Sequence, residues 1–470
     1  MAVSPASQRD LTTGPVAITL LLFALPSLGV NILQSLNNSV NAVWIGRFLG
    51  EEALAATSNA GMIIFLMFST LFGFSMATTI LIGQAMGRRD IENVRRTMGS
   101  SLGLFALTGV AAALLGWLFA PSLLRLLATP DAAYPLALTY LRVMFLCMPT
   151  SFVMILLSSS LRGVGDAVTP MWTSFLNIGL DIVLNPILIL GLGPIPAMGI
   201  AGSALATVIA GLVSVMVLVY WIYAKDLTIR LRGPELGWLK PDPEILKLIA
   251  RNGLPIGLSM IIMSGSALVM IGLINREGVD TAAAFGVMNQ LWSYVQMPAV
   301  AVGSAVSAMV AQNIGAGRWD RVGKVALAGV AINVAMTAFI LAVITIFARP
   351  LLELFLNPDS VAIPIGIHIN HVIGWSYLLM GISMVLTFVV RANGAVIGPL
   401  VILIVAAILV RFAVGFGLHP TMGADAIWLA FIAAGIVSFL LSVGYYFHGG
   451  WKKLSIGGTR RPEETLIVQG

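Results

Sequence analysis

Charge and cysteine are both scarce in this chain of 470 residues. Charged residues make up 10% of the sequence, against about 25% in soluble domains. Hydrophobic residues make up 58%, more than soluble cores of this size can bury. The single cysteine, Cys147, excludes an intramolecular disulfide bond and a metal site with several cysteine ligands. The sequence also lacks an HExxH motif, a carboxylate pair and a Ser-His-Asp set at membrane depth, so we expect no enzyme activity, no resident metal and no cofactor.

Long apolar runs are abundant instead. Runs of about twenty apolar residues recur along the whole chain, and each is long enough to cross a bilayer as a helix. The expected fold class is therefore an all-α integral membrane protein. The twelve predicted transmembrane spans lie near residues 15–42, 53–82, 97–120, 134–158, 169–191, 199–223, 250–274, 281–312, 325–348, 363–390, 396–416 and 425–447.

Basic residues are distributed unevenly between the two sides of the membrane to which the segments connecting these spans are assigned. With the N-terminus inside, 20 of the 26 Lys and Arg residues fall on the inner side. The remaining six are Arg47, Arg125, Arg142, Arg276, Arg349 and Arg411. This asymmetry follows the positive-inside rule and predicts a multi-pass protein of the cell (cytoplasmic) membrane with both termini in the cytoplasm. The net charge of +6 then reflects topology and attraction to membrane lipids, and it requires no nucleic-acid partner.

The two halves of the chain resemble each other at an offset of 228 or 229 residues. Pro26 matches Pro255 at 229, and Gln84 matches Gln312 at 228. Because each repeat contains six spans, both keep the same orientation, which predicts two six-helix lobes related by a pseudo-two-fold axis along the membrane normal. The predicted segments are a cytoplasmic tail (1–14), an N-lobe (15–224), an inter-lobe loop (225–248), a C-lobe (249–448) and a second cytoplasmic tail (449–470).

Asp181 is the only ionisable residue between Met171 and Gly193. A carboxylate inside an apolar span costs roughly 2.5–3.5 kcal/mol on insertion scales. Ser174, Asn177 and Asn185 share its helical face at spacings of three or four residues. No basic residue lies at similar depth in the nearby spans. We therefore interpret Asp181 as part of an ion or proton pathway rather than of a structural ion pair.

Other spans carry polar stripes at helical spacing. The first has Asn41 after Pro26, a proline that should kink the helix. The sixth has Thr207 among small residues that permit close helix approach. Taken singly, such amides and hydroxyls can equally be ordinary interhelical hydrogen-bonding groups. The candidates for a substrate cavity are Gln34, Asn37, Asn38, Asn289, Trp292, Ser293 and Gln296.

Several motifs give the chain a specific resemblance. VNAVWIGRFLGEEALAA, GQAMGRRD, LRGVGDAVTP and NIGLDIVLNP resemble, in order and spacing, the patterns of multidrug and toxic compound extrusion (MATE) transporters. The resemblance implies an antiporter that expels amphipathic, often cationic, compounds in exchange for H⁺ or Na⁺. It implies a cation-coupling site at Asn41, Asn177, Asp181 and Thr207, and a hinge at Pro26.

The sequence departs from that pattern at three positions. Asn41 stands where the family has an aspartate, and Met263 and Met380 stand where some relatives have carboxylates in the C-lobe. One carboxylate therefore remains to couple transport to an ion. With a single negative charge at the site we favour H⁺, while Na⁺ is the rival because four oxygen-bearing side chains could bind it.

The resulting prediction is a monomeric secondary antiporter for small organic cations. One alternative is a flippase for lipid-linked precursors from the same superfamily, which the scarcity of membrane-embedded basic residues disfavours. Another is a transporter of the major-facilitator type. The segment AGRWDRVGK resembles the loop motif of such transporters, but the corresponding loop of the first half does not.

Overall fold

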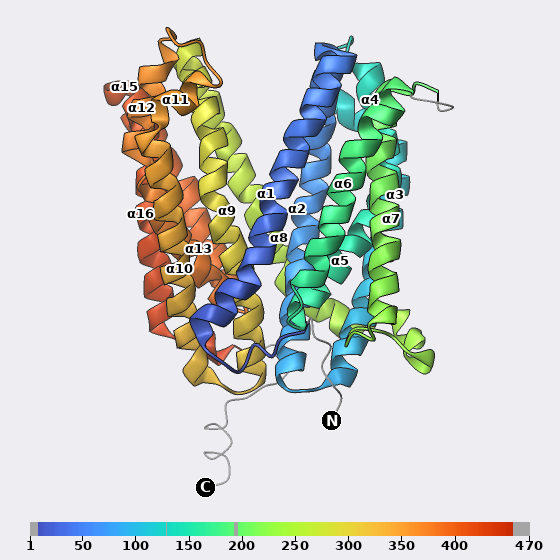
Figure 1. Ribbon diagram of the computed structural model, residues 1–470. Helices are drawn as coiled ribbons and strands as arrows, with labels where there is room; N and C mark the ends of the chain where they lie inside the picture. The colour runs from blue at the N-terminus through green and yellow to red at the C-terminus, as the bar shows by residue number, and fades with distance from the viewer. Residues whose placement is uncertain (1–7, 128, 192–195, 455–470) are drawn as a thin grey trace. The chain divides into compact units, whose positions relative to one another are not determined.

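The computed structural model describes residues 8–127, 129–191 and 196–454. These residues form helices and connecting turns without any β-strand, which confirms the predicted all-α membrane fold. Residues 455–470 of the predicted C-terminal tail and residues 1–7 of the N-terminal tail lie outside the described part of the chain. Within each half of the chain, the long helices run side by side along much of their length (Figure 1).

The helices of the first half are α1 (Val16–Leu49), α2 (Glu51–Gly87), α3 (Ile91–Leu126), α4 (Tyr134–Leu146), α5 (Met148–Gly163), α6 (Val168–Leu190), α7 (Gly199–Ala224) and the 3-10 helix η1 (Gly233–Leu239). Those of the second half are α8 (Pro243–Ile274), η2 (Asn275–Glu277), α9 (Val279–Gly315), α10 (Trp319–Ile346), α11 (Ala348–Glu353), α12 (Ala362–Ile373), α13 (Ser376–Arg391), α14 (Ile397–Ile404), the π-helix η3 (Val405–Val410), α15 (Arg411–Met422), α16 (Ala424–His448) and η4 (Gly450–Lys453).

Within the described residues, ten helices are long and apolar enough to cross a membrane, or twelve if each of two bent helix pairs is one span. The predicted fourth span is bent by 49° between α4 and α5, and the tenth by 48° between α12 and α13. Pro149 near the start of α5 lacks the N–H that would continue the hydrogen-bond ladder of α4, which accounts for the first break. Both breaks fall in corresponding spans, as expected for a repeated fold.

Two glycines at corresponding positions of the two halves also reflect the repeat. Gly50 precedes α2 with φ 86°, and Gly278 precedes α9 with φ 108°. An L side chain is disfavoured at such angles, so each position requires glycine. The two are 228 residues apart, the offset of the sequence repeat.

The chain divides into two compact units. Among the described residues, the first contains Gly29–Gly253 together with residues 8–10, and the second contains Leu11–Leu28 together with residues 254–454. The division therefore falls inside α1 and α8, within three residues of Pro26 and Pro255.

The segment before α1 belongs to the second unit for a local reason. Asn313 Nδ2 donates to the Leu11 carbonyl at 3.1 Å, and Arg318 Nη1 donates to the Thr12 carbonyl at 2.8 Å. Arg321 Nη2 reaches the carbonyl of Gly14 at 3.1 Å. These bonds attach the start of α1 to the ends of α9 and α10.

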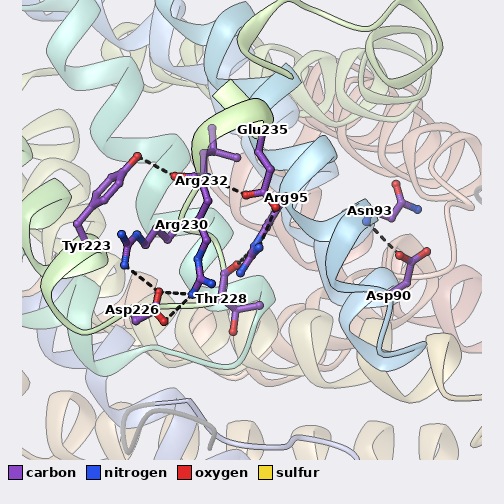
Figure 2. Close-up of polar contacts among 10 residues, drawn as sticks. Asp90, Asn93, Arg95, Tyr223, Asp226, Thr228, Arg230, Arg232 and Glu235 are labelled. Atoms are coloured by element: carbon purple, nitrogen blue, oxygen red, sulfur yellow. Dashed lines mark hydrogen bonds and ion pairs between the residues drawn. The ribbon is translucent and has the colours of Figure 1, made fainter. Parts of the chain in front are cut away.

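The inter-lobe segment is docked on α3 of the first unit. Arg95 of α3 donates to the Thr228 carbonyl at 3.1 Å and forms an ion pair with Glu235 at 2.9 Å (Figure 2). Burial opposes ionisation of Glu235, but hydrogen bonds from Arg95 and from the Arg232 amide outweigh it and hold the pKa of this carboxyl below its usual value. Figure 2 also shows Asp90 accepting the Asn93 amide hydrogen, which caps the start of α3.

A glycine notch on α3 receives the same segment. A Cβ atom added at Gly103 would lie 2.0 Å from the Leu239 carbonyl oxygen, and one at Gly99 would lie 3.0 Å from Cβ of Trp238. The two glycines are one helical turn apart, so they form a continuous groove for η1.

We expect Gly103→Ala to release this segment, because the added methyl and a backbone carbonyl cannot share the space and overpacking typically costs about 1–3 kcal/mol. Limited trypsinolysis of the purified protein should then cleave after Arg232, at the start of η1, at least several times faster than in wild type. The control is Gly237→Ala, where an added Cβ meets nothing within 4 Å. Equal cleavage rates in wild type and Gly103→Ala would contradict the docked arrangement.

Candidate functional site

The carboxylate of Asp181 lies in the first unit, with 1% of the residue exposed. Its Oδ2 accepts hydrogen bonds from Asn37 Nδ2 at 2.9 Å and from Asn41 Nδ2 at 2.8 Å. Its Oδ1 accepts from Thr207 Oγ1 at 2.9 Å and from Asn185 Nδ2 at 3.3 Å. The carboxylate thus joins α1, α6 and α7 through four uncharged donors.

Two local features place these groups. Asp166 fixes the start of α6, because its carboxylate accepts the amide hydrogens of Val168 at 3.1 Å and Thr169 at 2.9 Å. Gly202 of α7 then allows α7 to lie directly on α6, since a Cβ there would be 2.5 Å from the Leu188 carbonyl oxygen. This close approach brings the Thr207 hydroxyl within reach of Asp181.

The structure gathers only part of the predicted coupling set. Asn41 and Thr207 contact Asp181 directly, whereas Asn177 forms no hydrogen bond to it in the described part of the chain. Two residues outside that set take part instead. Asn37, predicted for the substrate cavity, bonds the carboxylate, and Asn185 bonds both Asp181 and the Asn41 side-chain oxygen at 3.1 Å. Asn185 shared the predicted helical face, so the spacing had already marked it.

The remaining cavity candidates of the first unit lie apart from this cluster. Gln34 and Asn38 are exposed on α1, and neither forms a hydrogen bond within the described residues. Pro26 lies inside α1, which continues through it as a helix. The assignment of Gln34 and Asn38 to a substrate cavity stays a prediction.

The four α9 residues predicted for the substrate cavity lie in different environments. Trp292 is buried in the core of the second unit and donates from Nε1 to Asn370 Oδ1 at 3.1 Å. Ser293 bonds back to the carbonyl of Gln290 at 2.6 Å, and Asn289 is exposed. Gln296 lines a small pocket, whose other lining residues include Tyr377, Met380 and Met384.

The Asp181 cluster is arranged for a charged carboxylate. Four donors occupy its lone-pair positions, so a proton added to either oxygen would face an N–H or O–H group instead of an acceptor. The Oδ1 atoms of Asn37 and Asn185 are buried and lack hydrogen-bond partners among the described residues. Rotation of one amide would turn such an oxygen toward Asp181, where it could accept a carboxylic proton or bind a cation.

Comparison with known proteins follows the same division of the chain. Residues 26–187 and 255–416 each match the MatE protein-family model. The probable multidrug resistance protein YoeA of Bacillus subtilis is 36% identical over 437 residues, which covers 93% of this chain and 94% of the relative. The probable multidrug resistance protein YpnP of the same organism is 30% identical over 448 residues, covering 95% and 98%.

A solved structure shows the same fold. It is described as the outward-facing conformation of a multidrug resistance MATE family transporter of the MOP superfamily. Its TM-score to this chain is 0.87 at 23% sequence identity, and the match covers 96% of this chain and 99% of the other.

Proposed function

Because the chain belongs to the MatE family of multidrug and toxic compound extrusion transporters, we propose that it is an antiporter that exports amphipathic organic cations in exchange for H⁺. Membership in this family removes the major-facilitator alternative. The names of the relatives favour multidrug extrusion over flipping of lipid-linked precursors.

The observation that supports this proposal is the Asp181 carboxylate held by uncharged donors alone. With no basic side chain bonded to it, its negative charge is available to a proton or to a cationic substrate. Protonation would neutralise the site and favour release of the cation outward, and loss of the proton inward would restore affinity. Since the donors come from three helices, each protonation step would also change how α1 is attached to α6.

The proposal includes the setting of the transporter. The protein would act as a monomer in the cytoplasmic membrane with both termini in the cytoplasm, as the asymmetry of 20 against six basic residues predicts. Transport would proceed by alternating access between the two lobes.

Liposomes loaded with purified protein provide the direct test. Efflux of a fluorescent organic cation should follow an imposed pH gradient at zero Na⁺ and should not respond to a Na⁺ gradient at fixed pH. A requirement for Na⁺ at fixed pH would replace H⁺ by Na⁺ at Asp181, and no response to either gradient would refute coupled antiport.

Pro26→Ala tests the hinge. An internal proline removes one backbone hydrogen bond and kinks or loosens the helix, and Pro26 lies three residues from the point where α1 passes between the units. We expect the alanine variant to reach the membrane in normal amounts but to transport at least fivefold more slowly. Pro121→Ala in α3 is the control, because that proline is also internal to a helix but lies within one unit. Wild-type rates for Pro26→Ala would exclude a hinge at this position.

A further inference from the structure

Arg411 is a basic residue inside a membrane-spanning segment of the second unit. The topology count left it among the six basic residues that are not on the inner side, and in the span Ile397–Met422 it lies fourteen residues after the first residue and eleven before the last. Its guanidinium packs over the Phe431 ring with 4.7 Å between the Cζ atom and the ring centroid. Only one hydrogen bond from it is found within the described residues, from Nη1 to Ser266 Oγ at 3.3 Å.

The guanidinium of Arg411 has N–H groups without acceptors, and no described acidic side chain pairs with it. Its Nε is buried without a partner, and Arg411 forms no ion pair with any described residue. The described acidic residues of the second unit all lie at helix ends or in loops: Glu277, Asp280, Asp320, Glu353, Asp359 and Asp425. A cation without a counter-charge is costly inside a membrane-spanning segment, and such residues usually serve binding or transport.

The sequence repeat relates the position of Arg411 to that of Asp181. Arg162 and Pro170 match Arg391 and Pro399 at an offset of 229, which carries Asp181 to Val410. The π-helix η3, Val405–Val410, lies between Pro399 and Arg411. A π turn closes between residues i and i+5 and so contains one residue more than an α turn. That extra residue moves the counterpart of Asp181 from Val410 to Arg411.

Ser266 of α8 stabilises this altered turn. Its hydroxyl donates to the Ala407 carbonyl within η3 and accepts from Arg411, so one side chain holds both the π-helix and the guanidinium. The first unit therefore carries a negative group at this repeat position, and the second unit carries a positive group.

A small pocket of the second unit is lined by Tyr377, Met380, Met384 and Gln296 and has room for about one water molecule. Arg411 is not among its lining residues, so the guanidinium site is separate from this pocket.

We propose that Arg411 binds the anionic group, a carboxylate or phosphate, of an amphipathic transported compound. The planar guanidinium can form paired charged hydrogen bonds with either group. This inference rests on the proposed export function and refines its substrate class, because it adds compounds with an anionic group to simple organic cations.

Equilibrium binding of two dyes tests the site without any ion gradient. Rhodamine B carries a carboxylate on a cationic aromatic body, and its ethyl ester lacks that carboxylate. By fluorescence anisotropy in phosphatidylcholine nanodiscs, we expect the wild-type protein to bind the acid at least fivefold more tightly than the ester. Arg411→Gln should weaken binding of the acid about tenfold and leave the ester within twofold, and Arg411→Lys should retain part of the preference. Arg349→Gln, at an exposed arginine of the same unit, is the control and should change neither dye.

Equal affinities for the acid and the ester in the wild-type protein would overturn the proposal, even if Arg411→Gln failed to fold. Equal losses of both dyes in Arg411→Gln would do the same. If phosphatidylglycerol in the nanodiscs abolished the preference for the acid, the anion at Arg411 would be a lipid phosphate and the substrate assignment would be wrong. Failure of proton coupling would leave these binding constants unchanged, so it can be distinguished from failure of the anion site.

Discussion

Asp181→Asn is expected to reduce efflux driven by a pH gradient to the level of liposomes without protein. The substitution keeps the size of the side chain but removes its negative charge and its titratable proton. One charge moved across 100 mV supplies about 2.3 kcal/mol, enough for a concentration ratio of roughly fiftyfold. Without a group that takes up and releases the proton, we expect that ratio to fall to one.

The geometry predicts how substrate binding should respond. An asparagine at this position would offer one carbonyl oxygen and one amide nitrogen in place of two acceptors. Two of the four donors now at the carboxylate would therefore lose their partner, namely either the pair from α1 or the pair Thr207 and Asn185. The fold should persist, since two bonds remain, and binding of a neutral dye should change no more than about threefold.

The measurement compares efflux and binding in one preparation. Asp425→Asn is the control, because that carboxylate is 60% exposed and contacts only His368 among the described residues. It should pump at the wild-type rate. Efflux by Asp181→Asn at the wild-type rate would show that the coupling proton binds elsewhere.

Much of the Asp181 site could be predicted from helical spacing. The spacing from Ser174 to Asn185 placed four polar residues on one face, and the family pattern pointed to Asn41 and Thr207. The pattern also implied Asn177, which forms no hydrogen bond to the carboxylate within the described residues. Side chains of an α-helix lean toward its N-terminus. Asn185 therefore leans back onto Asp181, as its 3.3 Å contact shows, whereas Asn177 leans away from it.

Other features depend on contacts between distant segments. Nothing in the composition of residues 405–410 distinguishes a π turn from an α turn, and the widened turn is held by Ser266, about 140 residues earlier. The topology count left Arg411 among the six basic residues that are not on the inner side, and the predicted span at 396–416 contained it, but the count did not show that its guanidinium lacks an acidic partner. In the same way, the α9 stripe was predicted from spacing alone, but Trp292 turns into the core because Asn370 supplies an acceptor there.

Gly202→Val should damage both the stability and the transport of the protein. A Cβ at this position would lie 2.5 Å from the Leu188 carbonyl oxygen and 3.0 Å from the Ile189 amide nitrogen. These are backbone atoms of α6, which cannot rotate away as a flexible side chain can. The valine must therefore push α7 away from α6, at an overpacking cost of about 1–3 kcal/mol or more.

The same displacement reaches the ion site, because Thr207 lies five residues further along α7 and its 2.9 Å bond to Asp181 depends on the close approach. We expect the melting temperature to fall by roughly 5 °C and transport to fall at least tenfold, measured by thermal unfolding of the purified protein and by efflux from liposomes. Gly179→Val is the matched control on α6, because a Cβ there meets nothing within 4 Å and the residue is exposed. That variant should keep its melting temperature within about 2 °C, since surface substitutions usually change stability little. A wild-type melting temperature for Gly202→Val would mean that α6 and α7 do not pack at this distance, and the bond between Thr207 and Asp181 would then lose its structural basis.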